Sequence, residues 1–126
     1  MKNNIFDSNI HVQDNSFEHL NKISEEIKNS GISRALCMFD NEKNIKDRKI
    51  FYENCKKTGN LTPVAFIRNT KNLKNEIKNI KRIGFKFIKF HPRNLNLKIG
   101  NKFYLRAFKI LNRIKICILW CTYDGW

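Results

Sequence analysis

The sequence predicts an α/β fold, a partial (β/α) barrel of TIM type with about five parallel strands and intervening helices. Five short apolar runs recur along the chain, and a helix-like segment separates each run from the next. Connections of that length join parallel strands through right-handed crossovers. Polar side chains follow the first, fourth and fifth runs, as they do at the carboxyl ends of barrel strands.

The first strand and helix are predicted from two different periods. Residues 5–12 alternate as a strand does, and residues 14–16 offer three N-cap candidates for the helix that follows. That helix ends at Gly31, because glycine commonly stops a helix. Its apolar face is expected from residues spaced three and four apart: Phe17, Leu20, Ile23 and Ile27.

The second strand, residues 32–39, is almost continuously apolar, which is typical of a parallel strand covered on both faces. Residues 41–57 are expected to form the next helix, and residues 61–67 the third strand. Pro63 lies near the start of that strand, where a missing N–H group costs least. The inner side of the second helix is expected to hold Ile50, Phe51, Asn54 and Cys55.

The third helix is predicted from a stripe of apolar residues spaced three or four apart, and this helix ends at Gly84. Residues 85–90 are then expected to form the fourth strand. Residues 103–114 form the next helix, with Leu105, Phe108 and Leu111 inward, and residues 116–122 form the fifth strand. The stripe of the third helix is Leu73, Ile77, Ile80 and Ile83. Residues 11–16, after the first strand, contain no glycine, which argues against a phosphate-binding loop there.

The length of 126 residues fits one domain, and no linker divides residues 1–126. An eight-stranded barrel takes roughly 200 residues or more, so the predicted barrel is incomplete. No run approaches the ~20 apolar residues of a membrane span, and the N-terminus does not resemble a signal peptide. We therefore expect a cytoplasmic protein without a membrane partner.

The net charge of +14 is uneven, with −2 over residues 1–40 and +16 over the rest. The lysines are scattered over every predicted helix, which favours a solvated surface, so nucleic acid is not the expected partner. The four cysteines form no CxxC pair and are expected to be buried free thiols.

The candidate site lies where the predicted strands end. Side chains two apart on a strand share a face, so Asp7, Asn9 and His11 are expected to point together, as are Lys89 and His91. His11 suits zinc through Nε2, although a hydrogen-bonded structural role remains an alternative. Lys89 also fits a packing role through its aliphatic stem.

Two further candidates have structural alternatives. Arg93 follows the fourth strand and can fork a carboxylate, or it can be an exposed loop residue. Cys117 and Cys121 lie in the fifth predicted strand, where core packing is the simplest role for both.

These segments resemble the metal-dependent amidohydrolase superfamily, in the branch with acyclic and aromatic decarboxylases and lactone-type hydrolases. Residues 7–11, DSNIH, resemble the Asp-x-His-x-His signature of its first strand. Residues 31–36, GISRAL, and 84–92, GFKFIKFHP, resemble its second and fourth strands. Residues 104–122 resemble the helix and strand that lead to its next metal histidine. The resemblance spans almost the whole chain and the first five strands of the family barrel.

The resemblance implies a set of roles, residue by residue. The first two metal histidines map to Asn9 and His11, and the strand-five histidine maps to Cys121, whose thiolate can also bind zinc. Apart from the resemblance, if the chain is active, Lys89 or His91 would have the catalytic role of orienting a carboxylate substrate, and Arg93 would bind that substrate. The family's sixth-strand histidine and eighth-strand aspartate fall beyond Trp126. The implied cofactor is a divalent metal, most simply zinc, which polarises the substrate or activates a water.

The expected function follows from this implied and incomplete site. The chain would be a truncated, amidohydrolase-like relative of metal-dependent hydrolases that act on C–N, C–O or carboxylate substrates, with weak or no activity alone. One alternative is a non-catalytic basic module that binds nucleic acid or another polyanion. Another is a homodimer, or a subunit that completes another chain's barrel, through the open edges of strands one and five.

Overall fold

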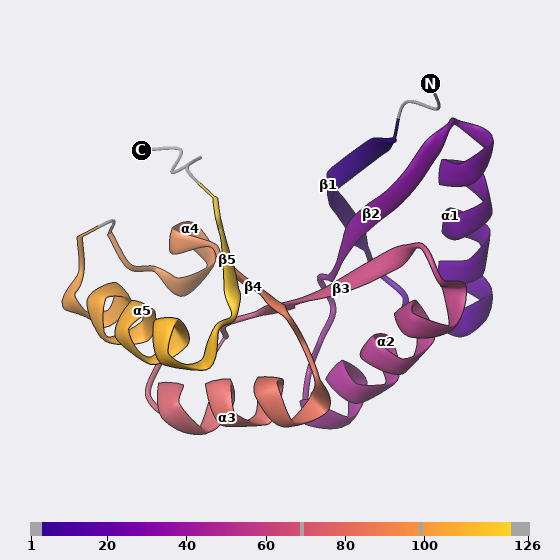
Figure 1. Cartoon of the computed structure of the whole chain (residues 1–126). Helices are drawn as coiled ribbons and strands as arrows, with labels where there is room; N and C mark the ends of the chain where they lie inside the picture. Colours follow the sequence, from indigo (N-terminus) through magenta and orange to yellow (C-terminus); the bar gives the residue numbers. More distant parts are fainter. Residues whose placement is uncertain (1–3, 69, 99, 122–126) are drawn as a thin grey trace. The chain divides into compact units, whose positions relative to one another are not determined.

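The computed structural model describes residues 4–68, 70–98 and 100–121. The strands are β1 (Ile5–Val12), β2 (Ile32–Phe39), β3 (Leu61–Phe66), β4 (Phe87–Phe90) and β5 (Cys117–Trp120). The helices are α1 (Phe17–Asn29), α2 (Ile45–Thr58), α3 (Leu73–Ile83), α4 (Pro92–Leu95) and α5 (Lys102–Ile114). Figure 1 shows how helices alternate with strands along the chain.

The sheet has the strand order β1-β2-β3-β4-β5, and the recorded pairs are parallel, β1 with β2, β2 with β3 and β4 with β5. A doubly wound sheet reverses its strand order at a switch point, and this order has no reversal. The predicted class, an α/β partial (β/α) barrel of five parallel strands, is confirmed.

The chain divides into two compact units, residues 1–64 and residues 65–126. The boundary lies inside β3, so the first unit holds β1, β2, α1, α2 and most of β3. The second unit holds the end of β3 and all later elements. We describe each unit by itself.

The first unit buries one face of each helix. Ser16 caps α1, since its hydroxyl accepts the N–H of His19, and Leu20 and Ile27 are buried as predicted. The second helix begins four residues later than expected, because Asn44 accepts the N–H groups of Lys46 and Asp47 as its N-cap.

The inner face of α2 was predicted only in part. Phe51 and Cys55 are buried, whereas the side chain of Ile50 is 37% exposed. Arg48 takes the inner position one turn before Phe51, where Nε and Nη2 both donate to Oε1 of Glu42. The buried face of α2 thus includes a charged residue, and it is centred on Arg48, Phe51 and Cys55.

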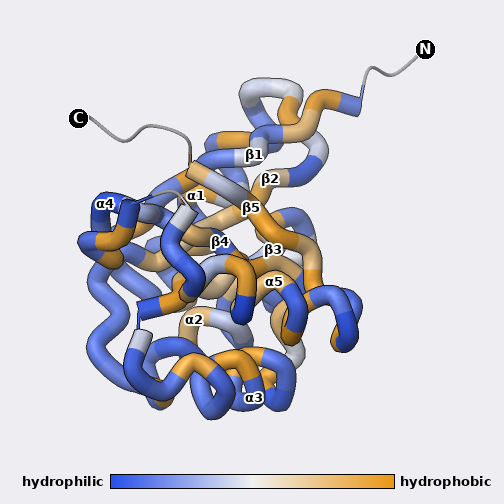
Figure 2. Tube along the Cα trace, turned by 90° about the vertical axis from the view of Figure 1, so that its left-hand side faces the viewer, coloured by the Kyte–Doolittle hydropathy of each residue, from blue (hydrophilic) through white to orange (hydrophobic). Residues whose placement is uncertain are grey.

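The second unit has an aromatic core between β4, β5 and α5. Phe90 lies within 6.4 Å of four other rings, measured between ring centroids. Those rings belong to Phe103, Tyr104, Phe108 and Trp120. Hydrophobic and hydrophilic residues alternate along α3 and α5, as amphipathic helices require (Figure 2).

Four local expectations for the second unit are wrong. Leu105 is 60% exposed rather than inward, since it lies opposite Phe103 and Tyr104 on α5. Cys117 is exposed and Cys121 is half-buried, in contrast to the buried Cys37 and Cys55. The fourth strand begins at Phe87 rather than residue 85, and α4 occupies part of the expected loop. Residue 122, expected to end the fifth strand, lies outside the described residues.

Candidate functional site

The carboxyl ends of β1 and β2 are joined by a carboxylate. Oδ1 of Asp40 lies 2.7 Å from Nδ1 of His11, and Oδ2 accepts a hydrogen bond from Nε2 of Gln13 at 2.9 Å. The backbone of Asp40 is fixed as well, because its N–H donates to the carbonyl of Val12. About one third of each side chain of the His11–Asp40 pair is exposed, so the pair lies at the surface of the first unit.

The second ring nitrogen of His11 faces Asn9. Nε2 lies 3.3 Å from Oδ1 of Asn9, so the side chains predicted to act together do meet. An ionised Asp40 only accepts hydrogen bonds, so it favours the neutral tautomer that carries its proton on Nδ1, and a ring that is also protonated on Nε2 donates from there to Oδ1 of Asn9. Two acceptor atoms at this distance attract a proton or a cation between them.

Asp7 does not extend this row. A register shift separates Asp7, which pairs with Ala35, from His11, which pairs with Met38. Four residues on β1 thus span three on β2, as in a β-bulge, which breaks the simple alternation of faces. The carboxylate of Asp7 accepts the backbone N–H of Asn9 at 2.9 Å. The expectation that Asp7 points with Asn9 and His11 fails at this bulge.

These donors fit a metal only in part. A carboxylate that holds Nδ1 of a histidine while Nε2 faces outward is the outer-shell arrangement of many zinc sites. Catalytic zinc, however, takes three protein ligands as a rule. Over the described ranges, no three His, Cys, Asp or Glu side chains gather closely enough to hold a metal ion. Asn9 and His11 therefore supply two donors, one fewer than such a site needs.

The second unit has a small cavity at the carboxyl ends of β3 and β4. Its volume is about 90 Å³. His91 follows β4 directly and lines the cavity together with Arg68, which lies two residues after β3. The remaining lining residues are Phe66, Ile67, Asn94 and Leu95. The carbon Cζ of Arg68 lies 5.0 Å from the centroid of the Phe66 ring, a cation–π distance.

The other predicted site residues of this unit lie near the same strand ends. Lys89 is buried on β4, and its carbonyl accepts the N–H of Ile67 at 3.4 Å. Arg93 is exposed on α4. Cys121 follows β5 and donates its N–H to the carbonyl of Phe90. Since Asn9 and His11 belong to the first unit, a shared site with Cys121 stays a prediction.

Sequence reasoning missed Asp40 and Arg68. Each is the first charged residue after a buried strand, β2 and β3 respectively. In a parallel sheet that position is where ligand-contacting side chains gather. The signal was therefore present in the sequence, although it is weaker than a histidine motif.

Comparisons with known protein families, with curated proteins and with solved structures find no match. Within the described residues, none of the helices combines the length and the apolar character that crossing a bilayer requires.

Proposed function

We propose that this chain is an amidohydrolase-like partial barrel that binds a small carboxylate compound at the carboxyl ends of β3 and β4, with little hydrolytic activity alone. The observation that carries the proposal is the cavity bordered by Arg68 and His91. It lies directly after β4, where the segment that resembles the family's fourth strand ends in His91, the residue expected to orient a carboxylate substrate.

The size of this cavity suits a carboxylate group. Its volume of about 90 Å³ is well below the roughly 300–1,000 Å³ of a typical ligand pocket, so it suits a small group such as a carboxylate with part of its stem. The planar guanidinium of Arg68 can donate two parallel hydrogen bonds to such a group. His91 and the amide of Asn94 add polar atoms, and Leu95 adds an apolar side.

One negative charge also lies near the cavity. The buried carboxylate of Glu76 accepts the backbone N–H of Arg68 at 3.0 Å. This bond fixes the backbone from which the Arg68 side chain starts. The same carboxylate repels an anion, so affinity depends on the cationic group of Arg68.

The test is an NMR titration of the ¹⁵N-labelled chain with benzoate, a carboxylate on an apolar ring. We expect saturable shifts of the amides of residues 66–68, 91 and 93–95, and at least a tenfold weaker affinity after Arg68→Ala. Arg113→Ala, an exposed arginine on α5, is the matched control and should leave the affinity unchanged. Shifts that do not saturate, or equal losses in both variants, would argue against the site.

Metal binding at His11 is a second candidate, favoured by the 2.7 Å contact between Nδ1 and Asp40. Asn9 and His11 would hold a divalent ion, most simply zinc, because an imidazole nitrogen is a common zinc ligand. A bound ion would polarise a substrate carbonyl or activate water. Calorimetric titration with zinc tests this. Loss of binding in His11→Ala, with binding retained in the helical His19→Ala, supports the site; equal binding in all three proteins contradicts it.

A further inference from the structure

The charge of this protein is concentrated in the second unit. Residues 65–126 carry 15 of the 25 Lys and Arg residues but only two of the 11 acidic ones, a net charge of +13. Residues 1–64 carry ten basic and nine acidic residues, a net charge of +1. Almost all of the excess of +14 therefore belongs to one half of the chain.

A chain-wide compositional bias does not explain this division. A bias toward lysine, asparagine and isoleucine would act on both halves, but the acidic residues are depleted in the second half only. The one acidic residue in its described part, Glu76, is buried. Across the described residues of the second unit, each exposed charged side chain is thus positive.

The positive side chains form rows on two helices. On α5, four exposed residues lie at spacings of four, three and four: Lys102, Arg106, Lys109 and Arg113. At about 100° per residue these lie within about 60° of one another around the helix and extend over about 16 Å. Helix α3 has a second row, formed by the exposed Lys74, Lys78, Lys81 and Arg82. The opposite faces of both helices are buried, and they are apolar except for Glu76 on α3.

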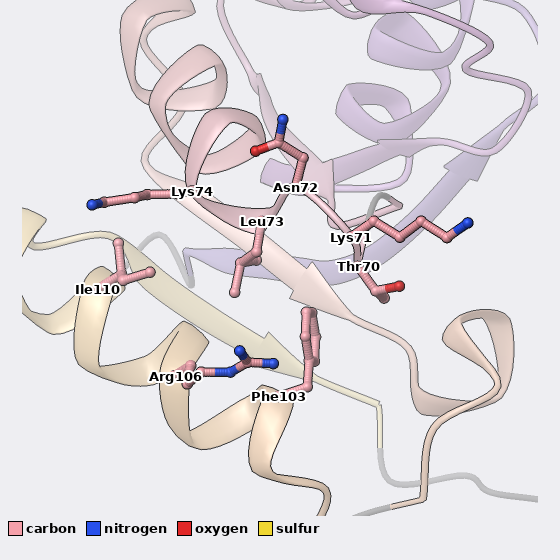
Figure 3. A pocket seen from close by; sticks show the side chains of 8 residues that line it. All are labelled: Thr70, Lys71, Asn72, Leu73, Lys74, Phe103, Arg106 and Ile110. Carbon is pink, nitrogen blue, oxygen red and sulfur yellow. The ribbon is translucent and has the colours of Figure 1, made fainter.

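A groove lies between the two helices. Its volume is about 250 Å³. Leu73 of α3 and Phe103 of α5 point toward each other at its base, with the guanidinium of Arg106 beside Phe103, while the side chain of Lys74 extends outward (Figure 3). The other lining residues are Thr70, Lys71, Asn72 and Ile110. Each basic row thus contributes one member, Lys74 or Arg106, to the border of this groove.

We propose that the α3–α5 face binds the phosphodiester backbone of nucleic acid without sequence preference. Arginine and lysine are the side chains that contact phosphates, and repeated cations along a helix match a repeated anion. Acidic side chains would repel this ligand, and none is exposed in the described part of this unit. This function goes beyond small-carboxylate binding and uses other residues.

The experiment measures binding of the full chain to a fluorescein-labelled 24-base-pair DNA duplex by anisotropy, between 25 and 200 mM NaCl. With about six phosphate contacts, the logarithm of the association constant should fall with the logarithm of salt at a slope of about −5. Replacing the α5 row by glutamine removes about three of these contacts and should flatten the slope by about 3. Replacing the α3 row by glutamine should flatten the slope by a similar amount.

The matched control removes four positive charges from the first unit. Lys46, Lys49, Lys56 and Lys57 are exposed on α2, and their replacement by glutamine should leave the slope unchanged. Far-UV circular dichroism confirms that each variant is folded. Three results would overturn the proposal: no binding at 25 mM NaCl, an equal loss in the α2 variant, or tighter binding to phosphatidylserine vesicles than to DNA at equal salt.

Discussion

Asp40 and His11 form a contact of 2.7 Å that links the carboxyl end of β2 to that of β1. The contact fixes the orientation of the imidazole, because the Asp40 backbone is itself hydrogen-bonded to Val12. It also sets which ring nitrogen faces Asn9.

Asp40→Ala should therefore change the tautomer of His11 with little effect on folding. Without the carboxylate, the neutral ring loses the acceptor that keeps the proton on Nδ1. Long-range ¹H–¹⁵N NMR spectra at neutral pH report the tautomer directly. The unfolding free energy should fall by about 1 kcal/mol or less, since the pair is partly exposed. Asp7→Ala is the control, and a ring spectrum unchanged by Asp40→Ala would contradict the assignment.

Arg48→Ala should destabilise the first unit strongly. Its side chain and that of Glu42 are 7% and 6% exposed, so removing the arginine leaves a buried carboxylate without this partner. Breaking a buried pair costs about 3–5 kcal/mol. Urea unfolding measures the loss. Arg82→Ala, at an exposed site on α3, should change the free energy by about 0.5 kcal/mol or less.

A double variant separates charge burial from packing. Replacing Arg48 by Met and Glu42 by Leu removes both charges and keeps similar volumes, so it should recover most of the stability lost in Arg48→Ala. A double variant as unstable as the single one would mean that the ion pair itself, and not the orphaned charge, accounts for the loss.

Tyr104→Phe should change how stability depends on alkaline pH. Burial raises the pKa of the Tyr104 hydroxyl above its usual value near 10. The unfolded chain therefore ionises this group first, and its contribution, complete below about pH 10, is lost as the pH rises toward the folded-state pKa. Urea unfolding from pH 8 to pH 11 should show a shallower decline in the phenylalanine variant.

The same variant should be less stable than wild type at neutral pH. The Tyr104 hydroxyl donates a hydrogen bond to the carbonyl of Leu97 at 3.1 Å, and its loss should lower stability by about 0.5–1.5 kcal/mol. The two curves should converge as the pH rises. Parallel curves would show that ionisation of Tyr104 does not contribute.

Local patterns predicted much of this fold. The bounds of β1 and β2 match the expected residues 5–12 and 32–39, because alternation and a continuous apolar run are visible within one segment. The four residues of α4 carry no period, so the short helix was invisible to the same reasoning. The bulge after Asp7 depends on the register with β2, which no single-segment pattern encodes.

The candidate site was predictable to a lesser degree. His11 and Asn9 meet as expected because they are close in sequence and share a strand end. Asp40 and Arg68 come from other strands, and only the fold brings them to His11 and His91 respectively. The buried positions of Phe51 and Cys55 followed from helical spacing. The exposure of Ile50 could not be predicted in this way, because it depends on the burial of Arg48.

The edge strands predict concentration-dependent self-association. β1 and β5 stand at the two ends of the strand order, and β1 exposes Ile5 and Phe6, whose exposed fractions are 51% and 52%. An edge with exposed apolar side chains pairs readily with another chain, and a charge on it opposes that pairing. Analytical ultracentrifugation of wild type should show dimers that increase with concentration, and Phe6→Lys should weaken dimerisation by at least tenfold. Leu105→Lys, at a 60% exposed leucine on α5, should have no such effect; a monomer at every concentration, or equal effects of both substitutions, would rule the edge out.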